Sequence, residues 1–160
     1  MSAPIFEKGP KGTPIFKGFS PLAPGTYTIW SQKYQGVVVD LAGAQQYGNI
    51  QGYPTNNTNA QKWTLTPEGQ DHKEFVTWEA VPLKSYIFNQ GNVWGSGLAG
   101  NFPVSATWEV TMLSPTTGTI GLKGSSGLLW TLTNGAAGTQ IVLQNANGDL
   151  NQVWTFTQAQ

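Results

Sequence analysis

The 160-residue sequence contains no cysteine and no arginine, and only 10% of its residues are charged. Without cysteine the chain cannot form disulfides, thiolate nucleophiles or zinc–thiolate sites. Its eight basic residues are all lysines, and eight acidic residues balance them. Proteins that bind nucleic acids normally carry a basic face rich in arginine. The composition therefore argues against a nucleic-acid partner.

A long apolar run is also missing. A transmembrane helix needs about 20 consecutive, mostly apolar residues, and no stretch of this chain approaches that length. The first residues, MSAPIFEKGPKG, do not contain the apolar core of a secretory signal peptide. We therefore expect a cytoplasmic protein that does not insert into membranes.

Histidine is scarce as well, which limits catalytic chemistry. The single histidine, His72, lies in the polar stretch EGQDHKEF, which is typical of a solvated loop. A Ser-His-Asp triad would have to use this residue as its base. We therefore do not expect an enzyme, and we expect no metal or cofactor.

Three similar segments recur along the chain at nearly constant spacing. They read AQKWTLTP, SATWEVTM and NQVWTFTQ, and their tryptophans, Trp63, Trp108 and Trp154, are 45 and 46 residues apart. Each tryptophan and the apolar residue two positions later share one face of an extended strand. This pattern predicts three equivalent strands, each buried on one side, whose tryptophans form the core.

The repetition extends to the residues that precede each tryptophan. Residues 37–63 align without gaps on 128–154 at an offset of 91, and residues 85–108 align on 40–63 at an offset of 45. Each unit also opens with a short strand-like segment, at residues 26–30, 75–80 and 118–123. Turn residues separate these segments, so each unit is predicted to hold about four short strands.

Three units of about 45 residues are too few for most β-propellers. They suit an all-β β-trefoil, in which six strands close a barrel and three hairpins cap it. The predicted repeats cover about residues 24–68, 69–114 and 115–160. One such unit cannot bury its apolar face alone, so packing explains the repetition.

Residues 1–23 stand outside the repeats as a Pro/Gly-rich N-terminal extension. Half of the ten prolines lie within the first 24 residues, and PIFEKG is echoed by PIFKG. We expect this extension to lie across the barrel or to stay mobile. The functional alternative is an arm that binds a partner through Phe6 and Phe16.

Several segments resemble the ricin B-type β-trefoil lectins. They are GTYTI, VVVDLAG, the GY of NIQGYPTNNT, and the Gln-x-Trp tripeptides QKW and QVW. The likeness covers about residues 24–160 and is closest to the small cysteine-poor lectins of mushrooms, a fold that mushroom protease inhibitors share. It implies a β-trefoil with up to three shallow sugar sites, one per repeat, and no catalysis.

The resemblance places a carbohydrate site in the first repeat. An ionised carboxylate can accept hydrogen bonds from two neighbouring sugar hydroxyls, and an amide can both donate and accept. An aromatic side chain packs against the apolar face of a pyranose. Ala60 departs from the family pattern, which has asparagine before the glutamine. The residues carried over are Asp40, Gly43, Tyr53, Asn56, Asn59 and Gln61.

The second repeat departs furthest from this pattern. The alignment places Ser85 and Ala106 at the positions of Asp40 and Gln61. The glycine-rich segment NQGNVWGSG instead offers an exposed indole, as in mushroom lectins that bind their glycan in this repeat through aromatic residues. The rival site is formed by Trp78, Asn92 and Trp94.

The third repeat keeps the amides of the pattern but not its carboxylate, because Thr131 replaces the acidic residue. A weaker carbohydrate site is carried over onto Asn134, Gln144, Asn147, Asn151 and Gln152. Gln61 and Gln152 have an alternative role, which is to hold backbone amides within the fold. Asp40 could similarly cap a turn.

Two other functions compete with a lectin that binds glycans containing galactose, N-acetylgalactosamine or N-acetylglucosamine. A protease inhibitor would present an exposed loop, and SQKYQG offers Lys33 to a trypsin-like pocket. A protein that binds its partner through the N-terminal extension is the third possibility. The sequence leaves a homodimer open.

Overall fold

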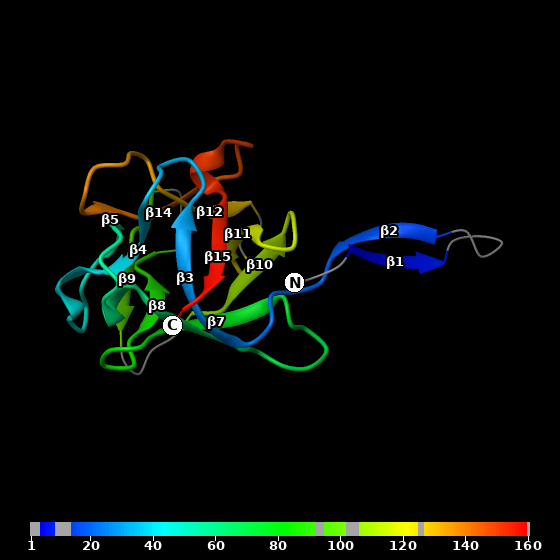
Figure 1. Cartoon of the computed structure of the whole chain (residues 1–160), viewed down its shortest axis with the longest axis horizontal. Coiled ribbons are helices and arrows are strands. Elements are labelled where there is room, and N and C mark those ends of the chain that lie inside the picture. The colour runs from blue at the N-terminus through cyan, green and yellow to red at the C-terminus, as the bar shows by residue number, and fades with distance from the viewer. Residues whose placement is uncertain (1–3, 9–13, 92–94, 102–105, 125–126, 160) are drawn as a thin grey trace.

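The computed structural model describes residues 4–8, 14–91, 95–101, 106–124 and 127–159, and these are mostly β-strand (Figure 1). Helical structure in these residues is limited to short 3₁₀ turns, η2 (Ala42–Ala44), η3 (Asn59–Gln61) and η4 (Leu150–Gln152). None of the described residues belongs to a helix that could cross a membrane.

Six strands close into a barrel. Each pairs antiparallel with two neighbours, and β3 completes the circle because it pairs with both β6 and β15. The strands are β3 (Gly25–Ser31), β6 (Trp63–Pro67), β7 (Phe75–Ala80), β10 (Trp108–Met112), β11 (Thr117–Leu122) and β15 (Trp154–Gln158).

Each repeat adds one hairpin at an end of the barrel. The hairpins are β4 (Val37–Leu41) with β5 (Ile50–Pro54), β8 (Tyr86–Asn89) with β9 (Leu98–Asn101), and β12 (Leu128–Thr131) with β14 (Val142–Asn145). The short strand β13 (Thr139–Gln140) pairs with β5. A six-stranded barrel with three hairpins is the β-trefoil that the repeat pattern predicts, so the predicted fold is confirmed.

The core forms where the three repeats meet. Trp63, Trp108 and Trp154 are at most 1% exposed, as their alternation with polar residues predicts. Their strands supply one tryptophan each, and the hairpins add further apolar side chains. Each Å² of apolar surface removed from water stabilises the fold by about 25 cal/mol. This shared core is therefore the main source of stability.

Hydrogen bonds from two of these indoles reveal the register of the second repeat. The Trp63 Nε1–H donates to the Val39 carbonyl (2.9 Å), and the Trp108 Nε1–H donates to the Ile87 carbonyl (3.1 Å). Ile87 follows Val39 by 48 residues rather than 45. The second repeat is therefore three residues shorter between its hairpin strand and its tryptophan.

This register corrects the alignment of Ser85 with Asp40. Phe88 occupies the position of Asp40, on the outward face of β8, whereas the Ser85 side chain is fully buried. Successive side chains of a strand alternate between its two faces, so an alignment error of three residues exchanges inside and outside. A gap-free alignment from the tryptophan could not detect the deletion.

The N-terminal extension forms a hairpin of its own. Strand β1 (Pro4–Lys8) pairs antiparallel with β2 (Pro14–Phe19) in a separate two-stranded sheet. Figure 1 shows this hairpin pointing away from the barrel, so the expectation that it lies across the barrel is wrong. Its strands satisfy each other's backbone groups, and Phe19 packs against the edge of the core. The role of Phe6 and Phe16 as a binding arm stays a prediction.

Candidate functional site

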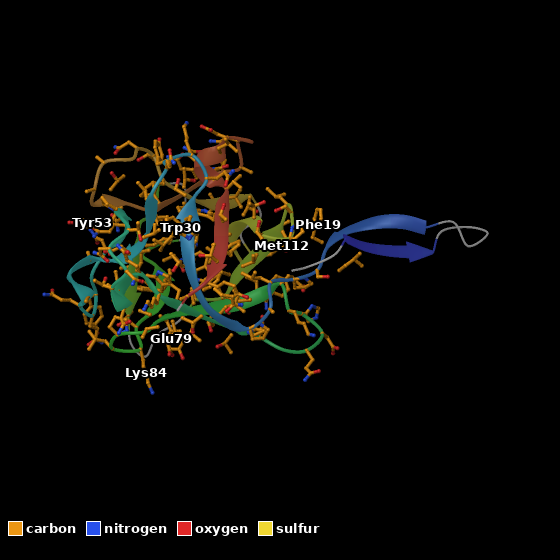
Figure 2. All side chains as sticks on the ribbon, viewed as in Figure 1. Phe19, Trp30, Tyr53, Glu79, Lys84 and Met112 are labelled. Atoms are coloured by element: carbon orange, nitrogen blue, oxygen red, sulfur yellow. The ribbon has the colours of Figure 1, made fainter. Side chains whose placement is uncertain are left out.

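An open pocket of about 430 Å³ lies on the first repeat, between hairpin β4–β5 and turn η3. Figure 2 shows Tyr53 at the surface on this side of the molecule, where it is 38% exposed. The pocket brings together five of the six residues predicted for the first repeat, namely Asp40, Gly43, Tyr53, Asn56 and Asn59.

Asp40 is held in the wall of this pocket by two side-chain amides. Its Oδ1 accepts a hydrogen bond from Gln51 Nε2 (2.9 Å), and its Oδ2 accepts one from Gln61 Nε2 (3.0 Å). Although Asp40 is only 5% exposed, a carboxylate offers about four acceptor positions, so the two amides leave capacity for a ligand. Both of these donors are glutamine side chains, so the Asp40 carboxylate is held by amides and not by the backbone N–H groups of a turn.

Gln61 has a different role from the one predicted. It is 2% exposed, and its Oε1 accepts a hydrogen bond from the Asn56 backbone N–H (2.9 Å). Its Nε2 donates to the Pro54 carbonyl (3.0 Å) as well as to Asp40. These bonds use both of its amide hydrogens and its oxygen, so the prediction that Gln61 contacts sugar is wrong. Gln61 instead positions Asp40 and ties down the loop.

The same network recurs in the third repeat. Gln152 is 1% exposed, its Oε1 accepts from the Asn147 backbone N–H (2.9 Å), and its Nε2 donates to the Asn145 carbonyl (2.9 Å). Its second Nε2 bond goes to the Thr131 hydroxyl (3.0 Å), at the position of Asp40. The glutamine of Gln-x-Trp is thus part of the fold in both repeats, and the predicted sugar contact through Gln152 is wrong.

The other predicted residues of the third repeat support loops rather than a shared carboxylate site. Asn134 Oδ1 accepts hydrogen bonds from the Ala136 N–H and the Thr139 hydroxyl (both 2.8 Å). Asn147 Oδ1 similarly accepts from the Asp149 N–H (2.8 Å). Gln144 is half-buried on β14, and Asn151 is half-buried in turn η4. Their binding role stays a prediction.

One of the three residues predicted for the rival site in the second repeat, Trp78, is not accessible to a ligand. Trp78 is fully buried and stacks on Phe156, with ring centroids 6.0 Å apart and an interplanar angle of 5°. On β7 every second residue faces the core, and Trp78 is one of these. The prediction that it contacts sugar is therefore wrong. Asn92 and Trp94 lie outside the described residues.

Gln51 and Pro82 are among the pocket residues that the sequence analysis did not predict. Gln51 lies directly opposite Asp40 in the β4–β5 ladder, so the hairpin register would have identified it as a partner. Pro82 reaches the pocket from the loop after β7, in the second repeat. A comparison of repeats cannot find Pro82, because the contact crosses from one repeat to the next.

Lys33, the residue proposed for protease inhibition, is engaged in an ion pair. Its Nζ lies 2.9 Å from Asp149 Oδ2, and the pair joins the loop after β3 to the loop before η4. The hydrogen bond to Asp149 raises the pKa of Lys33, and the same bond lowers the pKa of Asp149. The lysine is therefore tethered to its own protein.

Groups suited to metal binding do not gather among the residues that the structure describes. Within the described residues, no three His, Cys, Asp or Glu side chains are grouped so that they could hold an ion. His72 is exposed in the loop before β7, with its Nδ1 3.3 Å from Glu74 Oε1.

Comparisons with known proteins agree with this architecture. The Rhizoctonia solani agglutinin matches with a TM-score of 0.77 and 25% identity, over 87% of this chain and 98% of its own. A ricin B-like lectin from Macrolepiota procera, solved in complex with lactose, matches with a TM-score of 0.75 and 23% identity, over 87% and 99%. The chain has the fold of the fungal ricin B-like lectins.

A designed threefold-symmetric protein, ThreeFoil, also matches, with a TM-score of 0.75 and 16% identity, over 84% of this chain and 99% of its own. Its likeness supports the threefold reading of the repeats. No protein-family model matches the sequence, and a search of curated proteins found no match. The resemblance seen in the sequence is thus confirmed by structure.

Removing each Gln-x-Trp glutamine separates its structural role from its support of Asp40. Gln61→Ala and Gln152→Ala each remove the partner of one backbone N–H and one backbone carbonyl. We expect each to lower the free energy of unfolding by about 2 kcal/mol, measured by urea denaturation. Only Gln61→Ala should also weaken glycan binding, because Asp40 then loses an anchor. Equal losses of binding in both variants would contradict this assignment.

Proposed function

We propose that the protein is a non-enzymatic lectin that binds glycans through the Asp40 pocket of the first repeat. The observation that carries the proposal is a carboxylate anchored by two amides at the wall of an open pocket, with an exposed tyrosine beside it. Galactose, N-acetylgalactosamine and N-acetylglucosamine are the proposed sugars. The lactose complex of the Macrolepiota procera lectin supports the first of these.

The pocket supplies the groups that recognise a pyranose. The Asp40 carboxylate would accept hydrogen bonds from sugar hydroxyls, and Tyr53 would pack against the ring's apolar face. Asn59 lines the same pocket, and within the described residues no hydrogen bond occupies its amide. A single open site of this kind binds with about millimolar affinity, or about −4 kcal/mol.

Catalysis on a bound sugar has little support. Glycoside hydrolysis usually needs two carboxyl groups that flank the scissile bond. Asp40 is the one acidic residue among the described residues that line the pocket. This arrangement favours binding without cleavage.

Weak single sites gain strength when several act together. A homodimer remains a proposal on these grounds, since two copies would present two Asp40 pockets. Inhibition of a protease through Lys33 has less support than sugar binding, because the ammonium group is already paired with Asp149.

A glycan array tests the proposal directly. We expect fluorescently labelled protein to bind glycans with terminal galactose, N-acetylgalactosamine or N-acetylglucosamine, and free sugar to compete for this binding. A parallel trypsin assay should show unchanged activity in the presence of excess protein. Absence of binding to every glycan class would contradict the lectin proposal, and inhibition of trypsin would favour the alternative.

A further inference from the structure

Trp30 is a half-buried indole on the outer wall of the barrel, and its label lies over the barrel in the left half of Figure 2. Its Nε1–H donates to the Thr157 hydroxyl of the neighbouring strand (2.8 Å), which fixes the orientation of the ring. The strand pairings place Glu79 and Gly121 at the same position in the other two repeats. The fold therefore does not require an aromatic residue here.

Two shallow hollows border this indole. One, of about 220 Å³, is lined by Thr28, Thr55 and Asn57 as well as Trp30. The other, of about 690 Å³, is lined by Gln32, Thr155, Thr157 and Trp30 among others. Hydroxyl and amide groups around an indole are the combination that recognises the two faces of a sugar, polar at its rim and apolar across its ring.

These hollows adjoin the Asp40 pocket. Thr58 lines both that pocket and the smaller hollow, and Trp30 lines both hollows. Gln61, which anchors Asp40, also borders the smaller hollow. Three neighbouring depressions thus lie side by side, with Thr58 shared by the first two and Trp30 by the last two.

We propose that Trp30 forms a second pyranose subsite and that the ligand is an oligosaccharide. Its terminal sugar lies in the Asp40 pocket, and the sugars that follow pass over Thr58 and pack on the Trp30 indole. This inference rests on the proposed lectin function and adds to it the length of the ligand. Contacts with several sugar units strengthen binding without a deeper pocket.

Calorimetric titration with two probes tests the subsite. The probes are methyl β-galactoside, which fills the Asp40 pocket alone, and the galactose-terminated tetrasaccharide lacto-N-neotetraose. Loss of one aromatic stacking contact weakens binding about tenfold. Trp30→Ala should therefore lower the affinity for the tetrasaccharide about tenfold and change that for the monosaccharide less than twofold. Phe75→Ala, at another half-buried aromatic of the barrel strands, is the matched control and should change neither.

A second measurement uses the unmodified protein. The Trp30 indole N–H resonance, assigned by its loss in Trp30→Phe, should shift on addition of the tetrasaccharide and not on addition of the monosaccharide. Tetrasaccharide binding that needs Asp40 but leaves this resonance and the affinity ratio unchanged would overturn the subsite alone. Failure of both galactose-terminated probes to bind would overturn the subsite, whereas the proposed lectin function falls only if the glycan array also shows no binding to any glycan class.

Discussion

Asp40→Asn is expected to weaken glycan binding by about 10- to 100-fold while leaving the protein folded. Hydrogen bonds to a charged group contribute about 1.5–3 kcal/mol each, and every 1.4 kcal/mol is about a tenfold change in affinity. The substitution removes the charge and replaces an acceptor with a donor. At millimolar affinity, this loss places monovalent binding below calorimetric detection.

The anchors of Asp40 add to the effect. Gln51 and Gln61 each donate to a different carboxylate oxygen. An asparagine offers only one acceptor oxygen, so its amide nitrogen would face one of these donors. We therefore also expect a loss of about 1–3 kcal/mol in the free energy of unfolding, which urea denaturation would measure.

The matched control is Asp71→Asn, the same chemical change on an exposed loop away from the pocket. It should leave both glycan binding and stability unchanged. Binding to immobilised glycan measures both variants under multivalent conditions, where a weak residual affinity is still visible. Wild-type binding by a folded Asp40→Asn protein would show that the glycan site lies elsewhere.

Trp78→Ala is expected to destabilise the fold more than any change at the pocket, by about 3–5 kcal/mol. Trp78 is fully buried, stacks on Phe156 from β15 and meets Tyr27 from β3 edge to face, with centroids 6.3 Å apart. Truncation would leave a cavity between strands of all three repeats. For a domain of this size the melting temperature should fall by about 10 °C, as calorimetry would measure.

Two further variants separate the packing role of Trp78 from a role in sugar recognition: one at another indole, Trp30, and one at Trp78 itself. Trp30→Ala, at a half-buried indole on the barrel wall, should cost about 1 kcal/mol, because it empties no enclosed space. Trp78→Phe keeps an aromatic ring in the core and should bind methyl β-galactoside as the wild type does. A loss of binding in folded Trp78→Phe would revive the rival site that burial rules against.

The alternation around Trp63, Trp108 and Trp154 was enough to predict the strands that meet in the core. Side chains on an extended strand alternate between two faces, so every second residue of a half-buried strand is apolar and the sequence shows which face is buried. The register of the second repeat was not recorded in this way. The second repeat is three residues shorter, and a gap-free alignment therefore puts the buried Ser85, instead of the outward-facing Phe88, at the position of Asp40.

Five of the six residues predicted for the first repeat line the candidate pocket, but the sequence did not predict what each one does. Asp40 lies in strand β4 and Gln61 lies in turn η3, and only the hydrogen bonds distinguish the carboxylate in the pocket wall from the glutamine that supports it. Pro82 and Trp30 were missed, because neither residue type recurs at the equivalent position of the other repeats. Their relation to Asp40 depends on strands that pair far apart in the chain.

By itself the sequence determined a threefold all-β fold, a cysteine-free core built on tryptophans, and a first repeat richer in ligand-type side chains than the others. The first two properties follow from the repeat, the local periodicity and the composition, and the third from the resemblance to the ricin B-type lectins. The tertiary structure decided that Gln61 and Gln152 hydrogen-bond within the fold, that Trp78 is buried, and which surface adjoins Asp40. Those outcomes depend on hydrogen bonds and contacts between repeats, whose register no single repeat encodes.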